Sequence, residues 1–142
     1  PPRRVVEEFG AENVEPHEIY SVEADVFAPC ALGGILNDET VPQLRVEIVA
    51  GAANNQLLEP RHGDALAARG ILYAPDYVAN AGGIVNGCVE LLGWEPERAR
   101  LKVEAIYETL LDIYATARAQ GVPTYAAADR LAESRLRQNS ER

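Results

Sequence analysis

The chain has 142 residues, a formal net charge of −9 and a hydrophobic fraction of 47%, values typical of one ordinary globular domain. The acidic balance argues against a nucleic-acid partner, because phosphate binding requires clustered Lys and Arg. No apolar run reaches the ~20 residues of a membrane span, and the first residues lack the apolar centre of a signal peptide. We therefore expect no membrane partner and a cytoplasmic location.

Metal-ligating side chains are scarce in this sequence. Cys30 and Cys88 lie far apart without a C-x-x-C spacing, and the histidines are His17 and His62. Zinc sites usually take several ligands from Cys and His, so we expect reduced thiols, two surface histidines and no metal.

The chain opens with residues 4–9, which predict the end of a helix that Gly10 terminates. Short apolar runs without alternation follow, and each is typical of a strand in a parallel sheet covered on both faces. These runs are residues 25–28, 47–51 and 71–74. The segments between them, 40–44 and 61–69, could be helical, which indicates βαβ crossovers and a doubly wound α/β arrangement.

After the third run the pattern becomes helical. Residues 77–92 form an apolar segment with glycines at 82, 83 and 87. Pro96 then occupies a first helical position and opens a long amphipathic helix that ends at Gly121. A last helix runs from residue 123 or 124 to about 137. The fold class predicted is α/β, a partial Rossmann-like parallel sheet followed by C-terminal helices, although no G-x-G-x-x-G turn is present.

In open parallel sheets, ligands bind beyond the carboxyl ends of the strands. The segments found there are rich in glycine, alanine and asparagine: residues 29–34, 51–55, 75–76 and 80–83. Small residues let a flat ligand approach the backbone, and uncharged amides pair with a carboxamide or a carboxylate. This pattern suits a nicotinamide ring and its substrate. No nucleophile with an adjacent base and no lysine follows any strand, so a general base would lie elsewhere.

Each of these residues also has a purely structural interpretation. Asn54 and Asn55 could form a tight turn, and Asn80 could cap a helix. Cys30 is more simply a small buried side chain than a nucleophile. A glycine pair at 82 and 83 costs about 1 kcal/mol per residue in a helix relative to Ala, which favours a hinge or a ligand approach over close packing.

Four segments resemble the glutamate/leucine/phenylalanine/valine dehydrogenase family: residues 25–33, 51–56, 61–64 and 73–83. The similarity extends from about residue 5 to about residue 136. Within the family, segments 37–40 and 127–133 are most similar to members that act on branched-chain amino acids. The resemblance implies NAD-dependent oxidative deamination of a branched-chain L-amino acid to its 2-oxo acid and ammonia, by a homo-oligomer.

The resemblance also assigns roles to individual residues. It implies a cofactor site formed by Cys30, Ala31, Leu32, Gly33, Ala53, Asn54 and Asn80. It implies that Asn55 holds the substrate carboxylate, while Ile84 and Gly87 lie against the substrate side chain. Gly87 departs from the bulkier apolar residue usual in branched-chain enzymes, which suggests a roomier pocket.

Other family features fall outside this sequence. The Gly-rich phosphate loop, the catalytic lysines and an aspartate would all precede Pro1. We therefore expect no catalytic residue in this chain and no activity from the chain alone. Residues 1–93 would form the second half of an NAD-binding domain, with 94–142 as a helical segment packed on it. The alternative is a non-catalytic α/β module that binds a ligand or a partner.

Overall fold

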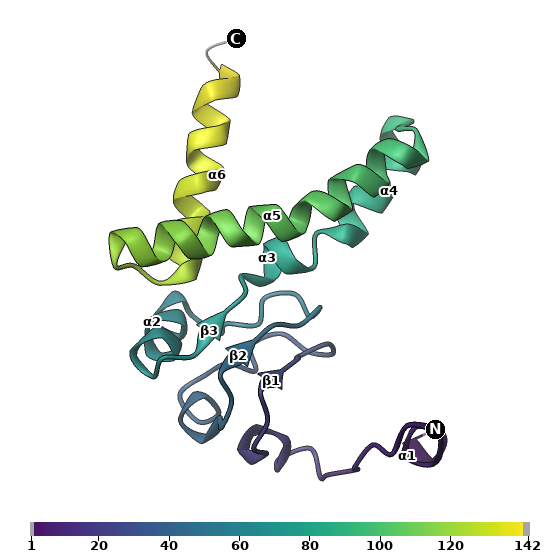
Figure 1. Cartoon of the computed structure of the whole chain (residues 1–142), viewed down its shortest axis with the longest axis vertical. Helices are drawn as coiled ribbons and strands as arrows, with labels where there is room; N and C mark the ends of the chain where they lie inside the picture. Colours follow the sequence, from purple (N-terminus) through teal and green to yellow (C-terminus); the bar gives the residue numbers. More distant parts are fainter. Residues whose placement is uncertain (1, 141–142) are drawn as a thin grey trace.

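The computed structural model describes residues 2–140, and Figure 1 shows their course. Three short strands lie on one side of the molecule, and the helices that follow them lie on the other. In chain order the helices and strands are α1 Pro2–Phe9, β1 Val26–Phe27, β2 Ile48–Val49, α2 Pro60–Ala68, β3 Leu72–Tyr73, α3 Asp76–Ala79, α4 Gly82–Leu92, α5 Pro96–Gln120 and α6 Thr124–Ser140. Two single 3₁₀ turns, η1 Ile19–Ser21 and η2 Val41–Gln43, precede β1 and β2.

The three strands form a parallel sheet in the order β1-β2-β3. Ile48 of β2 pairs with Val26 on one side and Leu72 on the other. The predicted fold class is therefore confirmed. The expectation that every strand is buried on both faces is wrong for β1 and β3, where Val26 is 45% and Leu72 36% exposed. β1 is an edge strand in residues 2–140, whereas Val49 of the central strand is fully buried.

The two crossovers differ in structure. The β2–β3 connection contains α2, close to the helix predicted at residues 61–69; it begins at Pro60 after its N-cap residue Glu59. The β1–β2 connection contains only η2 where residues 40–44 could have been helical. The backbone becomes extended at Leu44, with φ −57° and ψ 134°, so the helix ends after this single turn. Arg69 closes the turn by donating a hydrogen bond to the Leu44 carbonyl at 2.6 Å.

A compact core lies between the sheet and α2. Its fully buried members come from β2, α2 and the crossovers: Leu36, Leu44, Val49 and Leu66. His62 is 1% exposed, so the expectation that it lies on the surface is wrong. It lies four residues before Leu66, on the buried face of α2, and its Nδ1 accepts a hydrogen bond from the Glu59 amide at 3.0 Å.

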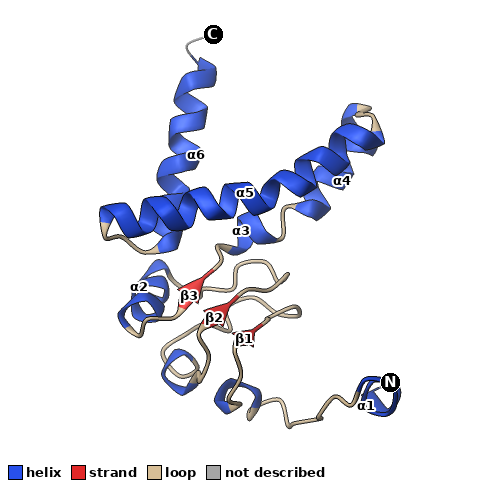
Figure 2. Cartoon of the chain, in the orientation of Figure 1, coloured by secondary structure: helices blue, strands red, loops and turns tan. Residues whose placement is uncertain are grey.

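The helical half of the chain follows its predicted boundaries closely (Figure 2). The apolar segment 77–92 breaks at Asn80 and Ala81 into α3 and α4. α5 begins at Pro96 and ends at Gly121, whose φ of 62° is the left-handed conformation that glycine favours. None of the helices described for residues 2–140 is long and apolar enough to cross a lipid bilayer.

α6 connects the helical half to the sheet. It contacts α2 and β3, and Thr124 at its start donates a hydrogen bond to the Tyr73 carbonyl at 2.6 Å. The Tyr77 hydroxyl donates to Asp129 of α6 at 2.7 Å. These contacts hold the helices against the edge of the sheet. The expected division of the chain into residues 1–93 and 94–142 stays a prediction.

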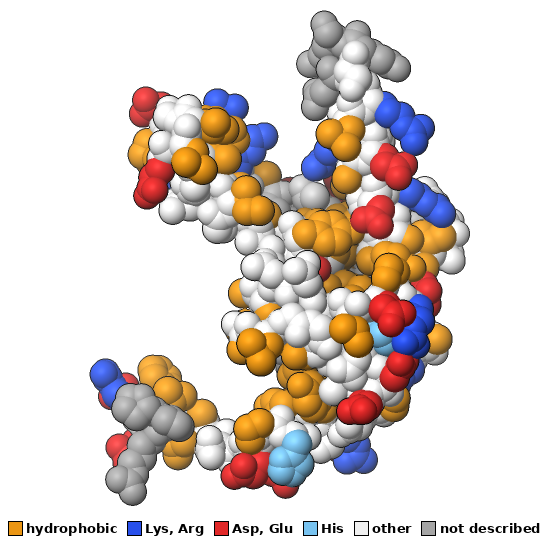
Figure 3. All heavy atoms as spheres, turned by 180° about the vertical axis from the view of Figure 1, so that it is seen from behind, with side chains coloured by type: hydrophobic (Ala, Val, Ile, Leu, Met, Phe, Trp, Pro, Cys, Tyr) orange, Lys and Arg blue, Asp and Glu red, His pale blue; other side chains and the backbone are white. Residues whose placement is uncertain are grey.

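Hydrophobic side chains remain exposed at the two extremities of the molecule, as Figure 3 shows for one face. At the α4 end, Ile84 is 76% and Leu91 85% exposed. At the N-terminal end, α1 lies apart from the sheet in Figure 1, and Phe9 is 78% exposed.

Candidate functional site at the carboxyl edge of the sheet

The loops that follow the three strands meet at one edge of the sheet. The Ala53 amide of the second loop donates to the Pro29 carbonyl of the first at 2.9 Å, and the Gly34 amide donates to the Asn55 carbonyl at 2.7 Å. The Asn80 side chain, just after α3, donates to Asn54 Oδ1 at 2.7 Å. The structure thus brings together the amides that the sequence places after separate strands.

Two glycines permit this close approach between loops. A Cβ at Gly33 would lie 2.6 Å from the Asn54 carbonyl oxygen, and a Cβ at Gly51 would lie 2.1 Å from the Pro29 carbonyl oxygen. Both distances are far below ordinary van der Waals contact. Any side chain at either position would push the loops apart, so these glycines are needed for the shape of the edge itself.

Asn55 has a φ of 52°. Among residues 2–140 it is the only non-glycine residue with positive φ, a conformation that Asn tolerates better than most residues. The structural interpretation of this asparagine as a turn residue is therefore correct. Its side chain is nevertheless exposed, so the turn leaves the amide free to face a ligand.

The side-chain amides of Asn54 and Asn80 form a hydrogen-bonded pair whose orientation is fixed. The Asn80 amide nitrogen lies 3.3 Å from the Ala53 carbonyl and 2.7 Å from Asn54 Oδ1. Both of these are acceptors, which fixes the Asn80 nitrogen toward them. Within the described part of the chain, no hydrogen bond uses Asn80 Oδ1 or the Asn54 amide nitrogen. The pair therefore presents one free acceptor and one free donor, the complement of a carboxamide.

The other residues assigned to the cofactor differ in accessibility. Cys30, Ala31 and Leu32 are exposed beside the amides, Leu32 at 73%. The interpretation of Cys30 as a buried side chain is therefore wrong. Ala53 is 4% exposed. Its carbonyl accepts from both Asn80 and Gln56, so it holds the neighbouring side chains in place.

The two α4 residues assigned to the substrate lie on one helix face. Ile84 and Gly87 are three residues apart, a spacing that places them on the same face. A Cβ at Gly87 would meet nothing within 4 Å. The structure thus leaves open space at the position where the sequence departs from branched-chain enzymes.

A buried polar group beneath the loops escaped the sequence reasoning. Gln56 is fully buried, and Asp76 and Tyr73 are 7% and 2% exposed. Asp76 Oδ1 accepts a hydrogen bond from the Tyr73 hydroxyl at 3.0 Å. Burial, and next the nearby Asp76 carboxylate, raise the pKa of Tyr73. A useful signal was available, since Asp76 lies within the segment 75–76 and Gln56 directly follows the segment 51–55.

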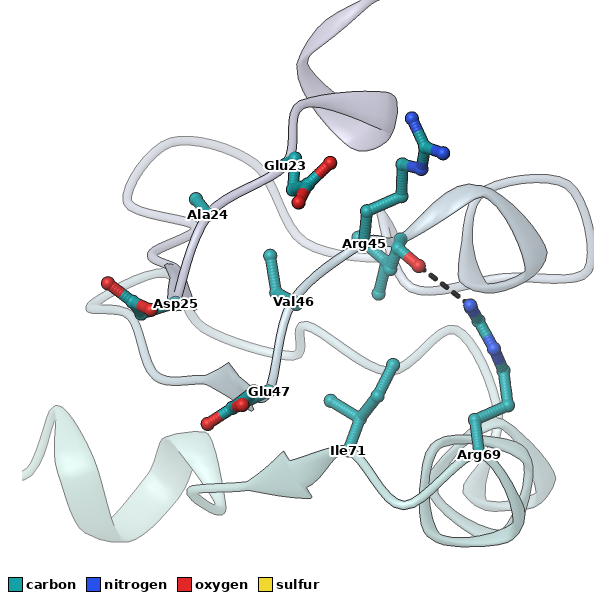
Figure 4. A pocket seen from close by; sticks show the side chains of 9 residues that line it. Glu23, Ala24, Asp25, Arg45, Val46, Glu47, Arg69 and Ile71 are labelled. Carbon is teal, nitrogen blue, oxygen red and sulfur yellow. Dashed lines mark hydrogen bonds between the residues drawn. The ribbon is translucent and has the colours of Figure 1, made fainter.

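A hollow of about 610 Å³ lies at the opposite edge of the sheet (Figure 4). Its lining residues precede the strands: Glu23, Ala24, Asp25, Leu44, Arg45, Val46, Glu47, Arg69 and Ile71. Parallel sheets bind ligands at their carboxyl ends, and this hollow faces the amino ends. Figure 4 shows the hydrogen bond of Arg69, which is donated to the Leu44 carbonyl. The amide-rich edge is therefore the better candidate.

No group of three or more side chains suited to a metal ion occurs in the described part of the chain. The chemistry of the amide-rich edge is instead that of hydrogen bonding to a neutral, flat ligand. Uncharged amides, small exposed residues and tight loop contacts fit a ring that carries a carboxamide, as nicotinamide does.

These features define a partial Rossmann-like α/β unit with an amide-rich edge at the carboxyl ends of its strands. The family model described as glutamate/leucine/phenylalanine/valine dehydrogenase matches residues 3–142. The chain belongs to this family of amino-acid dehydrogenases, which are oxidoreductases that act on CH–NH₂ donors.

Two curated relatives are equally similar to the chain. Leucine dehydrogenase from Geobacillus stearothermophilus is 57% identical over 133 residues, which are 94% of this chain and 36% of that protein. L-tryptophan dehydrogenase from Nostoc punctiforme is 57% identical over 135 residues, 94% of this chain and 38% of that protein. A crystal structure of L-tryptophan dehydrogenase from Nostoc punctiforme superposes with a TM-score of 0.92 at 52% identity, covering 99% of this chain and 42% of that one. The chain thus spans little more than a third of the length of these relatives, and similarity alone does not select one substrate.

Proposed function

We propose that the complete protein containing this chain catalyses the NAD-dependent oxidative deamination of a branched-chain L-amino acid. The amino acid, water and NAD give the 2-oxo acid, ammonium, NADH and a proton. NAD accepts the hydride that leaves the amino acid Cα. This chain supplies the part that holds the nicotinamide and the substrate carboxylate, and the protein acts as a homo-oligomer in the cytoplasm.

One observation supports this proposal most directly, namely the free donor and acceptor of the Asn54–Asn80 pair. A nicotinamide carboxamide offers one oxygen and one NH₂ group, and the pair offers the matching partners. Cys30, Ala31 and Leu32 lie exposed beside the pair, where a ribose and ring could rest against them. Gly33 and Ala53 keep the loops close enough for these groups to face one ligand.

Asn55 is the residue we assign to the substrate carboxylate. Its exposed amide follows Asn54 directly, and its carbonyl is fixed by the Gly34 amide at 2.7 Å. The amide nitrogen can donate to a carboxylate oxygen. Ile84 and Gly87, on the same face of α4, are assigned to the substrate side chain.

No side chain of this chain is assigned to proton transfer. The described residues at the amide-rich edge include no lysine. A proton acceptor for the amino group would come from the remainder of the complete protein. The isolated chain is therefore expected to be inactive, and activity of the 142-residue chain with leucine and NAD would refute this part of the proposal.

A second candidate substrate is an aromatic L-amino acid. The open space at Gly87 and the 57% identity with L-tryptophan dehydrogenase both favour a larger side chain. Leucine remains the first candidate because segments 37–40 and 127–133 resemble the branched-chain enzymes.

Kinetics of the complete protein test the proposal. NADH formation is followed with leucine, valine, isoleucine, phenylalanine and tryptophan, using NAD and NADP in parallel. We expect NAD and a branched-chain amino acid to give the highest kcat/KM. Faster turnover of tryptophan would select the second candidate, and no turnover of any amino acid would favour a non-catalytic binding module.

The variant Gly87→Val adds a matched test of the substrate pocket. Filling the open space should lower kcat/KM for the largest substrates by roughly tenfold or more, since steric exclusion of one or two methylene groups is worth about 1–3 kcal/mol. The short-chain substrate valine should be affected little. An unchanged preference would show that Gly87 does not line the pocket.

A further inference from the structure

We infer that Gln56 is a positioning residue that holds all three loops of the candidate site in register for the nicotinamide and the substrate. The inference rests on the proposed function and deepens it. Gln56 is fully buried and does not face a ligand itself. It acts through the residues that do, namely Asn54, Asn55 and Asn80.

Gln56 bonds to each loop through a different group. Its carbonyl accepts from the Leu36 amide at 3.0 Å, which ties it to the loop after β1. Its side-chain nitrogen donates to the Gly51 and Ala53 carbonyls, both at 2.9 Å, which closes the loop after β2 on itself. Its backbone amide donates to Asp76 Oδ2 at 3.2 Å, at the start of α3.

Asp76 extends this connection to the third loop. Its backbone carbonyl accepts from the Asn80 backbone amide at 2.8 Å, and its carboxylate accepts from the Tyr73 hydroxyl. Asn80 is thus held at a fixed distance from Gln56 along a short hydrogen-bonded path. Displacing Gln56 would therefore change the Asn54–Asn80 pair from both sides.

The orientation of the Gln56 amide is determined by its surroundings. Gly51 and Ala53 both present carbonyl oxygens to it, so only the NH₂ group can face them. Gln56 Oε1 is buried and has no donor among residues 2–140. Leaving a buried acceptor unpaired is unfavourable, and a core position that served packing alone would accept an apolar side chain at lower cost. The two donated bonds are the reason we give for a glutamine here.

The neighbouring backbone supports the same conclusion. Asn55, directly before Gln56, holds a φ of 52°, a conformation that costs a non-glycine residue free energy. The hydrogen bonds of Gln56 on both sides hold this conformation in place. They fix the direction of the Asn55 side chain before any ligand binds, which is the preorganisation that binding sites require.

The experiment compares Gln56→Met with a matched control, Gln43→Met, in the complete protein. Methionine keeps the length of glutamine and removes the side-chain NH₂ group that donates to the Gly51 and Ala53 carbonyls. Gln43 is an exposed glutamine whose side-chain nitrogen donates, among residues 2–140, only to the nearby Glu39 carbonyl. Steady-state kinetics are measured well below the thermal midpoint of each variant. We expect kcat/KM for the amino acid to fall ten- to a hundredfold in Gln56→Met and to stay unchanged in Gln43→Met.

A milder variant, Tyr73→Phe, keeps the inference testable if Gln56→Met does not fold. It removes the hydroxyl that donates to Asp76 and leaves the ring in the core. We expect a smaller fall in kcat/KM, about threefold to tenfold, in the same direction. Unchanged kinetics in a folded Gln56→Met variant would overturn the inference, whatever its thermal midpoint. If only Tyr73→Phe folds, unchanged kinetics in that variant would overturn it.

Hydrogen exchange separates this inference from the proposed function. The backbone amide of residue 56 donates to Asp76, and that of Leu36 donates to the residue 56 carbonyl. Both should exchange faster in Gln56→Met than in the wild-type protein and the Gln43→Met control. Should the wild-type protein turn over no amino acid, the proposed function fails while the exchange data still test the network. Unaltered exchange in these amides would overturn the positioning role.

Discussion

The packing of Gly63 against Tyr125 predicts that replacing this glycine with alanine destabilises the protein, whereas the same replacement stabilises most helices. Gly63 lies in α2, where replacing glycine with alanine normally stabilises a helix by about 0.5–1 kcal/mol. A Cβ at this position would lie 2.4 Å from Cδ1 and 2.8 Å from Cε1 of the Tyr125 ring in α6. The ring cannot rotate away freely, because its hydroxyl donates to Asp64 at 3.0 Å. Gly63→Ala must therefore shift α6 or break that hydrogen bond.

The size of the effect follows from two opposing contributions. Overpacking a close contact costs about 1–3 kcal/mol, and the helix preference returns less than about 1 kcal/mol of this. A net destabilisation of about 1–2 kcal/mol corresponds to a fall of roughly 2–8 °C in the thermal midpoint for a chain of this size. Thermal unfolding followed by circular dichroism measures it.

Gly87→Ala is the matched control for this prediction. Gly87 also lies inside a helix, and a Cβ there meets nothing within 4 Å. We expect this variant to be as stable as the wild-type protein or slightly more stable. A Gly63→Ala variant that is as stable as Gly87→Ala would refute the close packing of α6 on α2.

Two further predictions concern the amides and the charges. Asn55→Gly keeps the left-handed backbone and removes the side-chain amide, so KM for the amino acid should rise about ten- to a hundredfold, as expected for losing a hydrogen bond to a charged group. KM for NAD should change less, and equal changes in both KM values would argue against a role in binding the carboxylate. Hydrogen bonds from Arg61 lower the pKa of Asp38 and of Glu59. A lowered pKa in the folded state contributes stability that is fully present above the ordinary values of 3.8 and 4.5 and is lost as the pH falls from there through the lowered pKa. Arg61→Gln should therefore lower the thermal midpoint slightly at neutral pH and leave it unchanged in strong acid. The same loss at both pH values would show that it does not come from the lowered pKa values of Asp38 and Glu59.

The sequence predicted the sheet because its signals are local. Three apolar runs separated by crossovers give a parallel sheet, and Pro96, Gly93 and Gly121 mark helix ends through their own backbone preferences. The same reasoning predicted that the amide-rich loops meet, since loops after parallel strands share one edge. It failed for residues 40–44, where the backbone becomes extended at Leu44 after a single turn.

Features set by distant contacts could not be predicted in this way. The burial of His62 depends on the crossover that carries Asp38, which lies 3.3 Å from His62 Nε2. The role of Gln56 depends on Asp76, twenty residues later in the chain. Neither partner is visible from hydrophobic periodicity, because that pattern reports only which face of an element is buried. The exposure of Val26 likewise depends on what lies beside β1 rather than on its own sequence.

A crystal structure of the complete protein with NAD and its amino acid would test the central claim most directly. The account predicts the nicotinamide carboxamide within hydrogen-bond distance of Asn80 Oδ1 and the Asn54 amide nitrogen, with the substrate carboxylate at Asn55. A nicotinamide bound away from these three side chains, for example in the hollow between Glu23 and Arg69, would contradict it.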